Sequence, residues 1–237
     1  MFPFHFGVAK YIQDHHVCEP CISAFAGVSG GAAVACTLAC GIDVLDYFEE
    51  AMKKNRVGLF GMCDAVIEVC LTMFKKYKVK NIEKDKLFIQ LSSAGGLKPE
   101  LCSEFKDIEQ CVDVIRASSH IPVVGGLLPY KVDGMGMYYD GGLVNLLPIL
   151  PDTLKQKHRI IKVDALGYSS NCDIHIGFSV PYSWAFVPRK KHIMRLIFRY
   201  GYLKAKQFFE PFSEELIHSE IHSIEKVIKS PMILSKM

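Results

Sequence analysis

The sequence predicts an α/β fold with a mainly parallel central sheet. Short apolar segments typical of buried strands alternate along the chain with longer segments of helical spacing. Half of the 237 residues are hydrophobic and 22% are charged, which excludes a disordered chain. Neither a repeat nor a linker divides the chain. We therefore expect one domain over residues 1–237, with a core at about 7–180 and a helical C-terminal segment at about 186–230.

The first part of the chain predicts a helix, a strand, a tight turn and a second helix. Helical spacing covers Val8–Asp14, an apolar strand is expected at Cys21–Ala26, and an Ala-rich helix at Gly30–Cys40 that ends before Gly41. The region 21–42 contains no charged residue and is long enough to cross a bilayer. Its small residues and glycine pair favour a strand followed by a helix.

The remaining elements follow from periodicity and from helix-ending signals. Helices are predicted at 44–53, 63–78, 108–118, 191–209 and 214–229. Strand character is found at 87–92, at 137–139, and in the regions 159–166 and 174–180.

The first candidate reactive group is Ser29, in the turn Gly27-Val28-Ser29-Gly30-Gly31. A sharp strand-to-helix turn exposes a serine hydroxyl, and the flanking glycines remove side chains that would clash. The helix expected to start at Gly30 adds unpaired N–H groups near Ser29, so the Gly30 N–H is a candidate oxyanion donor. A glycine-rich packing turn without chemistry is the alternative.

A serine nucleophile needs a base, and Asp140 before Gly141 and Gly142 is the best candidate. The glycines permit a tight turn that brings the carboxylate to Ser29, and partial desolvation raises its basicity. Asp133 is a weaker rival in an expected hairpin tip. A Ser-Asp-His triad on the α/β-hydrolase fold is disfavoured, because that fold needs several strands before its nucleophile and only one fits before Ser29.

Three ordered motifs together resemble the patatin-like phospholipases, nearest to the adipose triglyceride lipase branch. They are Gly27-Val28-Ser29-Gly30-Gly31-Ala32, then residues 117–122 (ASSHIP), then residues 139–148 (YDGGLVNLLP). The resemblance covers about residues 7–202. It implies a three-layer α/β/α fold, Ser29 as nucleophile and Asp140 as base. It also implies metal-free and cofactor-free hydrolysis of acyl esters in phospholipids or glycerolipids through an acyl-enzyme.

The N-terminus departs from the family pattern. The family opens with a strand and a glycine-rich loop that supplies much of the oxyanion hole, whereas Phe6-Gly7-Val8 resembles the helix that follows that loop. We therefore expect the domain to be N-terminally incomplete and its activity to be weak. The alternative is a catalytically silent lipid-binding or regulatory protein that keeps the fold.

The net charge of +3 is unevenly distributed. Residues 186–210 carry seven Lys or Arg against one acid, so this window carries +6. Residues 189–209 form an expected amphipathic helix that either lies on an anionic membrane or lipid-droplet surface or packs its apolar face in the core. Neither a zinc-finger spacing nor an aromatic–basic motif indicates nucleic acid as a partner.

The nine cysteines do not form a disulfide framework, and the N-terminus does not resemble a signal peptide, so a cytoplasmic location is expected, peripheral to membranes or lipid droplets. Cys18 and Cys21 have C-x-x-C spacing without a second pair, which favours a structural turn. His218 and His222 share a helical face without an evident third ligand, so no metal site is expected.

Overall fold

The computed structural model describes residues 2–15, 24–54, 61–169, 171–181, 190–211 and 214–229. The chain forms two compact units, one of residues 19–160 and one of residues 1–18 together with 161–237. The single-domain organisation stays a prediction. The C-x-x-C pair at Cys18 and Cys21 lies outside the described residues.

The unit of residues 19–160 contains a five-stranded sheet and most of the helices. Its strands are β1 (Phe25–Val28), β2 (Leu87–Ser93), β3 (Pro99–Cys102), β4 (Tyr130–Val132) and β5 (Gly136–Asp140). Its helices are α2 (Gly30–Ala39), α3 (Val44–Lys53), α4 (Gly61–Tyr77), α5 (Ile108–Ser118), α6 (Asp152–Lys157) and the short 3₁₀ turn η1 (Gly141–Leu143).

The sheet is mixed, and the predicted mainly parallel arrangement is not confirmed. The strand order is β1-β2-β5-β4, with β3 also paired to β2. Only β1 and β2 are parallel, whereas β2–β3, β2–β5 and β4–β5 are antiparallel. The reason is local: β3 and β4 belong to tight hairpins with β2 and β5, and a hairpin forces antiparallel pairing.

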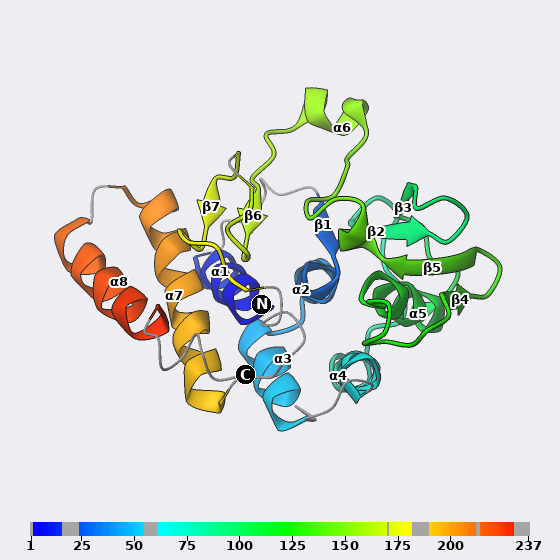
Figure 1. The fold of residues 1–237 in the computed structure, drawn as a ribbon, viewed down its shortest axis with the longest axis horizontal. Helices are drawn as coiled ribbons and strands as arrows, with labels where there is room; N and C mark the ends of the chain where they lie inside the picture. Colours follow the sequence, from blue (N-terminus) through cyan, green and yellow to red (C-terminus); the bar gives the residue numbers. More distant parts are fainter. Residues whose placement is uncertain are drawn as a thin grey trace. The chain divides into compact units, whose positions relative to one another are not determined.

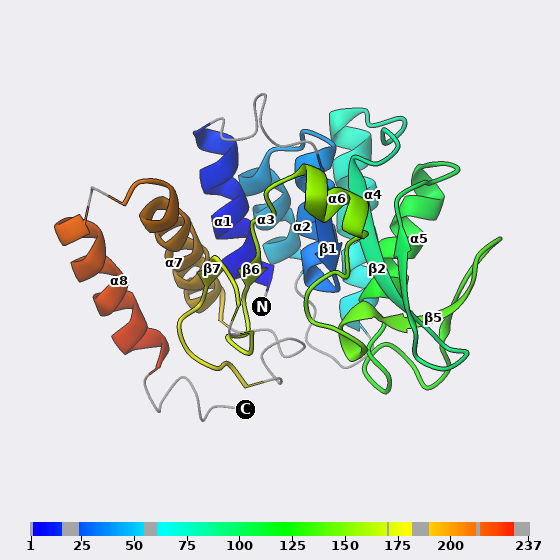
Figure 2. The same cartoon turned by 90° about the horizontal axis from the view of Figure 1, so that it is seen from above.

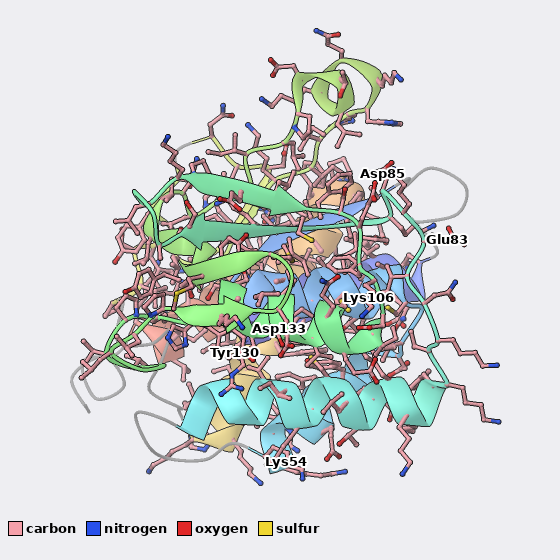
Figure 3. All side chains as sticks on the ribbon, turned by 90° about the vertical axis from the view of Figure 1, so that its right-hand side faces the viewer. Lys54, Glu83, Asp85, Lys106, Tyr130 and Asp133 are labelled. Carbon is pink, nitrogen blue, oxygen red and sulfur yellow. The ribbon has the colours of Figure 1, made fainter. Side chains whose placement is uncertain are left out.

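Helices and sheet form layers within this unit. Helices α2, α4 and α5 lie on one side of the sheet and α6 on the other (Figures 1 and 3). Strand β2 lies at the centre, and its residues Leu87, Ile89 and Leu91 are fully buried. A central strand that is buried on both faces is typical of α/β proteins. The unit is therefore of the α/β class and is compatible with a patatin-like fold.

Side-chain caps fix where two of these helices begin. The carboxylate of Asp43 accepts a hydrogen bond from the Asp46 N–H at 2.8 Å, and Asp107 accepts one from the Gln110 N–H at 2.7 Å. Each cap satisfies an N–H that has no partner inside its helix, and each carboxylate also interacts favourably with the positive end of the helix.

The second unit joins the two ends of the chain. It contains α1 (Phe2–Asp14), the parallel pair β6 (Val163–Asp164) and β7 (Ile174–His175), α7 (Lys191–Phe209) and α8 (Glu214–Ile228). Figure 2 shows α1 beside α7, and the two helices approach closely at glycines. A Cβ built on Gly201 would lie 2.2 Å from the Phe4 carbonyl oxygen, and one on Gly7 only 1.9 Å from that of Phe198.

The basic window predicted at 189–209 coincides with α7 from Lys191 onward; Lys190 is the residue before the helix, and Arg189 is not among the described residues. The apolar face of α7 is buried, including Ile193, Ile197 and Tyr200. Lys190 and Lys191 are exposed, and Arg199 forms an ion pair with Glu220 at 2.9 Å. The solvent-exposed face of α7 therefore carries basic residues.

Membrane crossing finds no support in the described helices, since none of them is both long enough and apolar enough to span a bilayer. Within the uncharged stretch 21–42, α2 is only 10 residues long.

Candidate active site

Strand β2 brings the ends of two other strands together. Val28, the last residue of β1, pairs with Gln90, and Asp140, the last residue of β5, pairs with the next residue, Leu91. The residue that follows Val28 is Ser29. The register of the sheet therefore places Ser29 and Asp140 side by side, although 111 residues separate them in sequence.

Ser29 occupies a strained turn between β1 and α2. Its φ of 53° and ψ of −130° are values that glycine adopts readily and other residues avoid. The turn is tight because β1 and α2 nearly touch: a Cβ built on Gly27 would lie 2.3 Å from the Gly31 carbonyl oxygen. Gly30 and Gly31 open α2, where the first N–H groups have no carbonyl partner within the helix.

The hydroxyl of Ser29 donates a hydrogen bond directly to the carboxylate of Asp140. Ser29 Oγ lies 2.6 Å from Asp140 Oδ2. The other carboxylate oxygen, Oδ1, accepts a hydrogen bond from the Gly142 N–H at 2.7 Å. Glycine is needed at 141, because a Cβ there would lie 2.2 Å from the Gln90 carbonyl oxygen. The two oxygens of Asp140 thus have separate partners, and Oδ2 faces the serine.

Burial changes the acidity of Asp140. Its side chain is 4% exposed, and desolvation raises the pKa of Asp140 to about 6, against opposing contributions from its hydrogen bonds with Ser29 and Gly142. Desolvation disfavours the charged form of a carboxyl group. An ordinary aspartate is a weak base, whereas a carboxylate with a pKa near 6 accepts a proton more readily and is still ionised at neutral pH.

Two buried serines are hydrogen-bonded to the backbone of the dyad residues. Ser118, at the end of α5, accepts a hydrogen bond from the Ser29 N–H at 2.9 Å and donates one to the Gln90 carbonyl at 2.8 Å. Ser92 donates to the Asp140 carbonyl at 2.9 Å. Ser118 belongs to the second quoted motif, but neither role was predicted. Only the tertiary structure brings these residues together, and no local spacing signals it.

Gln90 fixes the loop that follows Asp140. Its buried side-chain amide donates to the carbonyls of Gly141 at 3.1 Å and Asn145 at 2.9 Å, and its Oε1 accepts from the Ile149 N–H at 2.7 Å. This role was not predicted; the signal for it in the sequence is a glutamine within an apolar strand, since a polar side chain buried there needs hydrogen-bond partners.

Asp133, the weaker candidate base, lies in an environment unlike that of Asp140. It lies in the β4–β5 turn, labelled in Figure 3, with its side chain 89% exposed and 2.9 Å from the Lys131 ammonium. The hydrogen bond and charge of Lys131 lower the pKa of Asp133. A solvated carboxylate of this kind is a poor general base.

Among the described residues, no histidine ring is hydrogen-bonded to the side chains of the dyad. The backbone carbonyl of His120 accepts a hydrogen bond from the Asp140 N–H at 2.9 Å. Its ring is 2.8 Å from the Leu128 carbonyl oxygen and stacks on Tyr139. Neither Ser29 nor Asp140 is hydrogen-bonded to a described imidazole ring.

The other candidate ligands do not converge. Over the described ranges, no group of three His, Cys, Asp or Glu side chains is placed to hold a metal ion. The His218 ring is 3.1 Å from the Gln207 amide. Cys36, Cys40, Cys70, Cys102, Cys111 and Cys172 are free thiols.

The α/β fold and the juxtaposed serine and aspartate match the class that the motifs predict, and comparison with known proteins supports the patatin-like assignment. No protein-family model matches the chain. It is 26% identical over 159 residues to patatin-like phospholipase domain-containing protein 4 of Homo sapiens, an alignment that covers 62% of this chain and 62% of that protein.

Two further relatives are longer. The chain is 27% identical over 187 residues to patatin-like phospholipase domain-containing protein 2 of Bos taurus, covering 73% of this chain and 38% of that protein. It is 26% identical over 137 residues to omega-hydroxyceramide transacylase of Homo sapiens, covering 52% of this chain and 25% of that protein. The matched region is thus well under half the length of these two relatives.

Proposed function

We propose that this protein is a lipid acyl hydrolase that cleaves fatty-acyl esters with Ser29 as nucleophile and Asp140 as general base. The observation that carries the proposal is the 2.6 Å hydrogen bond from the Ser29 hydroxyl to a buried carboxylate with a raised pKa. Similarity to proteins named as patatin-like phospholipases supports ester hydrolysis and a glycerolipid or phospholipid substrate.

In the first half of the proposed reaction, Ser29 Oγ attacks the ester carbonyl carbon while Asp140 Oδ2 takes the hydroxyl proton. The tetrahedral intermediate collapses, the bond to the alcohol oxygen breaks, and Asp140 returns the proton to that leaving oxygen. The acyl group is left on Ser29. The Gly142 N–H holds the carboxylate in place throughout, because it binds the oxygen that does not exchange protons.

In the second half, Asp140 takes a proton from water, which attacks the acyl carbon. Collapse of this intermediate breaks the bond to Ser29 Oγ, which recovers the proton, and the fatty acid leaves. An alcohol in place of water would yield a transferred acyl group, and one of the similar proteins is named a transacylase. Product analysis with and without an alcohol acceptor separates the two outcomes.

The negative charge of each tetrahedral intermediate needs donors. The Ser29 N–H is engaged by Ser118, so the first N–H groups of α2, with Gly30 foremost, are the proposed donors. Backbone N–H groups at a helix start combine hydrogen bonding with the positive end of the helix dipole.

The lipid substrate implies that the protein works at a surface. Lys190 and Lys191 at the start of α7 are exposed and could attract anionic headgroups of a membrane or lipid droplet. Vesicle binding that is unaffected by neutralising them would remove this part of the proposal.

A fluorophosphonate probe tests the nucleophile. It should label the protein at Ser29, and Ser29→Ala should abolish labelling and hydrolysis of a short-chain ester. Asp140→Asn should retain the fold and lose at least roughly a hundredfold in turnover, because the proton acceptor is gone.

The matched control is Asp133→Asn, at an exposed carboxylate, and its ester turnover should equal that of the wild type. Labelling that persists in Ser29→Ala would assign the nucleophile elsewhere. Intact, folded protein that neither reacts with the probe nor hydrolyses esters would favour the silent lipid-binding alternative.

A further inference from the structure

An apolar loop follows the candidate active site in the unit of residues 19–160. It runs from Ile121 to Pro129, between α5 and β4, and contains no charged residue. Leu127 and Leu128 are 81% and 77% exposed, the highest values for large apolar side chains among the described residues, and Val123 is exposed as well. Adjacent exposed leucines are unusual, since they leave a contiguous apolar surface in water.

The apolar loop is connected to the dyad through His120. His120, which precedes it, hydrogen-bonds through its carbonyl to the Asp140 N–H at 2.9 Å. The ring of the same histidine donates through Nε2 to the Leu128 carbonyl at 2.8 Å. Gly126 lies against that ring, where a Cβ would be 3.3 Å from it. One residue thus connects the exposed leucines to the backbone of the proposed base.

Part of the loop backbone is hydrogen-bonded within the loop. The Val123 N–H donates to the Gly126 carbonyl at 2.9 Å, and the Gly125 N–H donates to the Ile121 carbonyl at 2.7 Å. Pro122 and Pro129 have no N–H at all. Unsatisfied N–H groups are the main cost of moving a loop out of water, so this arrangement lowers the cost of entering an apolar phase.

The loop also contains a residue with a strained backbone conformation. Val123 has a φ of 72°, which is a strained value for a β-branched residue. Strain of this kind persists where surrounding hydrogen bonds enforce it, and it is commonest at functional positions. The loop is therefore a fixed projection with its apolar side chains presented outward.

Charge near the loop is balanced. On its C-terminal side, Lys131 is paired with Asp133 at 2.9 Å. On its N-terminal side, the Arg116 guanidinium lies 4.6 Å from the centre of the Tyr130 ring, whose hydroxyl donates to Asp113 at 2.8 Å. A surface of this type suits the neutral acyl region of a lipid layer better than an anionic headgroup.

We propose that the Ile121–Pro129 loop inserts Leu127 and Leu128 into the acyl region of a lipid surface and so brings the dyad to its substrate. The inference rests on the proposed function for the identity of the occupant, a lipid layer. Insertion of the loop predicts that the protein binds uncharged lipid, whereas attraction by the basic face of α7 would require anionic lipid.

The first test measures cosedimentation with phosphatidylcholine vesicles, using full-length Ser29→Ala protein so that hydrolysis does not alter the lipid. Leu127→Ser/Leu128→Ser should lower the vesicle partition coefficient at least about tenfold, because the favourable transfer of two leucine side chains from water into the acyl region is lost. Leu45→Ser/Leu71→Ser, at two exposed leucines on α3 and α4, is the matched control and should change it less than about twofold.

The second test follows insertion directly. The single tryptophan is first removed by Trp184→Phe. In that background Leu128→Trp should show blue-shifted emission when vesicles are added, and Leu71→Trp should not. This readout does not depend on loss of binding and so remains informative if the serine variant is unstable.

Equal binding by both double-serine variants, or an unshifted Leu128→Trp emission, would overturn the proposal. So would binding only to anionic vesicles, or loop-dependent dimerisation without vesicle binding, which would make a second copy the occupant. Failure of the proposed function would appear separately, as wild-type protein that binds vesicles through the loop but is not labelled at Ser29.

Discussion

The buried carboxyl of Asp140 should give the protein a measurable pH signature. As a base it must be ionised, so ester turnover should rise with pH and reach half its maximum near pH 6, the pKa to which burial raises it. A turnover profile from pH 4 to 9 tests this. A half-maximum near pH 4 would show a solvated carboxylate instead.

The same shift affects folding stability with the opposite sign. The folded-state pKa lies above the ordinary value of 3.8, so the protonated form stabilises the fold below about pH 4, and that contribution is lost as pH rises through about 6. Asp140→Asn removes the buried charge. Its unfolding free energy should exceed that of the wild type above pH 7 by on the order of 3 kcal/mol, with little difference at pH 4.

Ser118 is a positioning residue whose loss should affect both stability and rate. Ser118→Ala leaves the Ser29 N–H and the buried Gln90 carbonyl without this partner, which should cost about 1–3 kcal/mol. In the folded variant, fluorophosphonate labelling of Ser29 should slow by roughly 10- to 100-fold, because the strained turn relaxes.

Thr72→Ala removes a comparable hydroxyl from the surface of α4 and should leave labelling unchanged. A labelling rate for Ser118→Ala equal to that of the wild type, at a lowered melting temperature, would make Ser118 structural only.

The two candidate reactive residues could be identified from the sequence, but not the residues that are hydrogen-bonded to them. Ser29 and Asp140 each lie next to glycines, and a glycine pair after a strand is a local signal. Ser118, Gln90 and Ser92 act through contacts between distant segments, and a single serine or glutamine in an apolar segment has many alternative explanations. Their functions emerge only from the sheet register.

At the scale of elements, the close approach of β1 and α2 makes glycine at 27 essential. Gly27→Ala would place a Cβ 2.3 Å from a backbone oxygen that cannot move aside, so the variant should lose roughly 1–3 kcal/mol or more of unfolding free energy. Gly95→Ala has open space around its Cβ and should change stability by less than about 1 kcal/mol. Urea unfolding of both variants gives the comparison, and similar losses would contradict the tight turn.

Helices were easier to predict than strands. The bounds expected for the helices at 44–53, 108–118 and 191–209 are those observed, because each has several turns of amphipathic spacing. Strand β3 and the helix α6 were not predicted, and β4 was implied only by the hairpin tip expected at Asp133, since three to six residues give too little periodicity to recognise. The antiparallel contribution of these short strands was therefore underestimated, and the sheet was expected to be mainly parallel.

At the scale of the whole molecule, one unit is built from both ends of the chain. Helix α1 packs closely against α7 at Gly201, where a Cβ would lie 2.2 Å from the Phe4 carbonyl oxygen. Gly201→Ala should therefore separate these helices, lower the melting temperature by several degrees, and increase amide hydrogen exchange in α1 and α7. Unchanged protection in α1 would show that the contact tolerates a side chain.

The packing of the two ends of the chain into one unit could not be predicted from the sequence. Each helix could be recognised from its own spacing, but periodicity does not show which helix packs on which. The glycines at 7 and 201 indicate a close approach only once the partner is known. Likewise, the amphipathic spacing of α7 was compatible with a membrane surface and with a protein core, the core being the favoured interpretation. Burial of Ile193, Ile197 and Tyr200 supports the core for its apolar face.

The backbone of Ser29 has an evolutionary consequence. Its φ of 53° with ψ of −130° costs energy for any residue with a side chain, whereas glycine adopts it without penalty. Replacing the proposed nucleophile by glycine would therefore relieve strain rather than create it. A lineage could lose catalysis at this position and keep, or even gain, a stable fold. A serine in so unfavourable a conformation is expected where a position is used for chemistry rather than for folding.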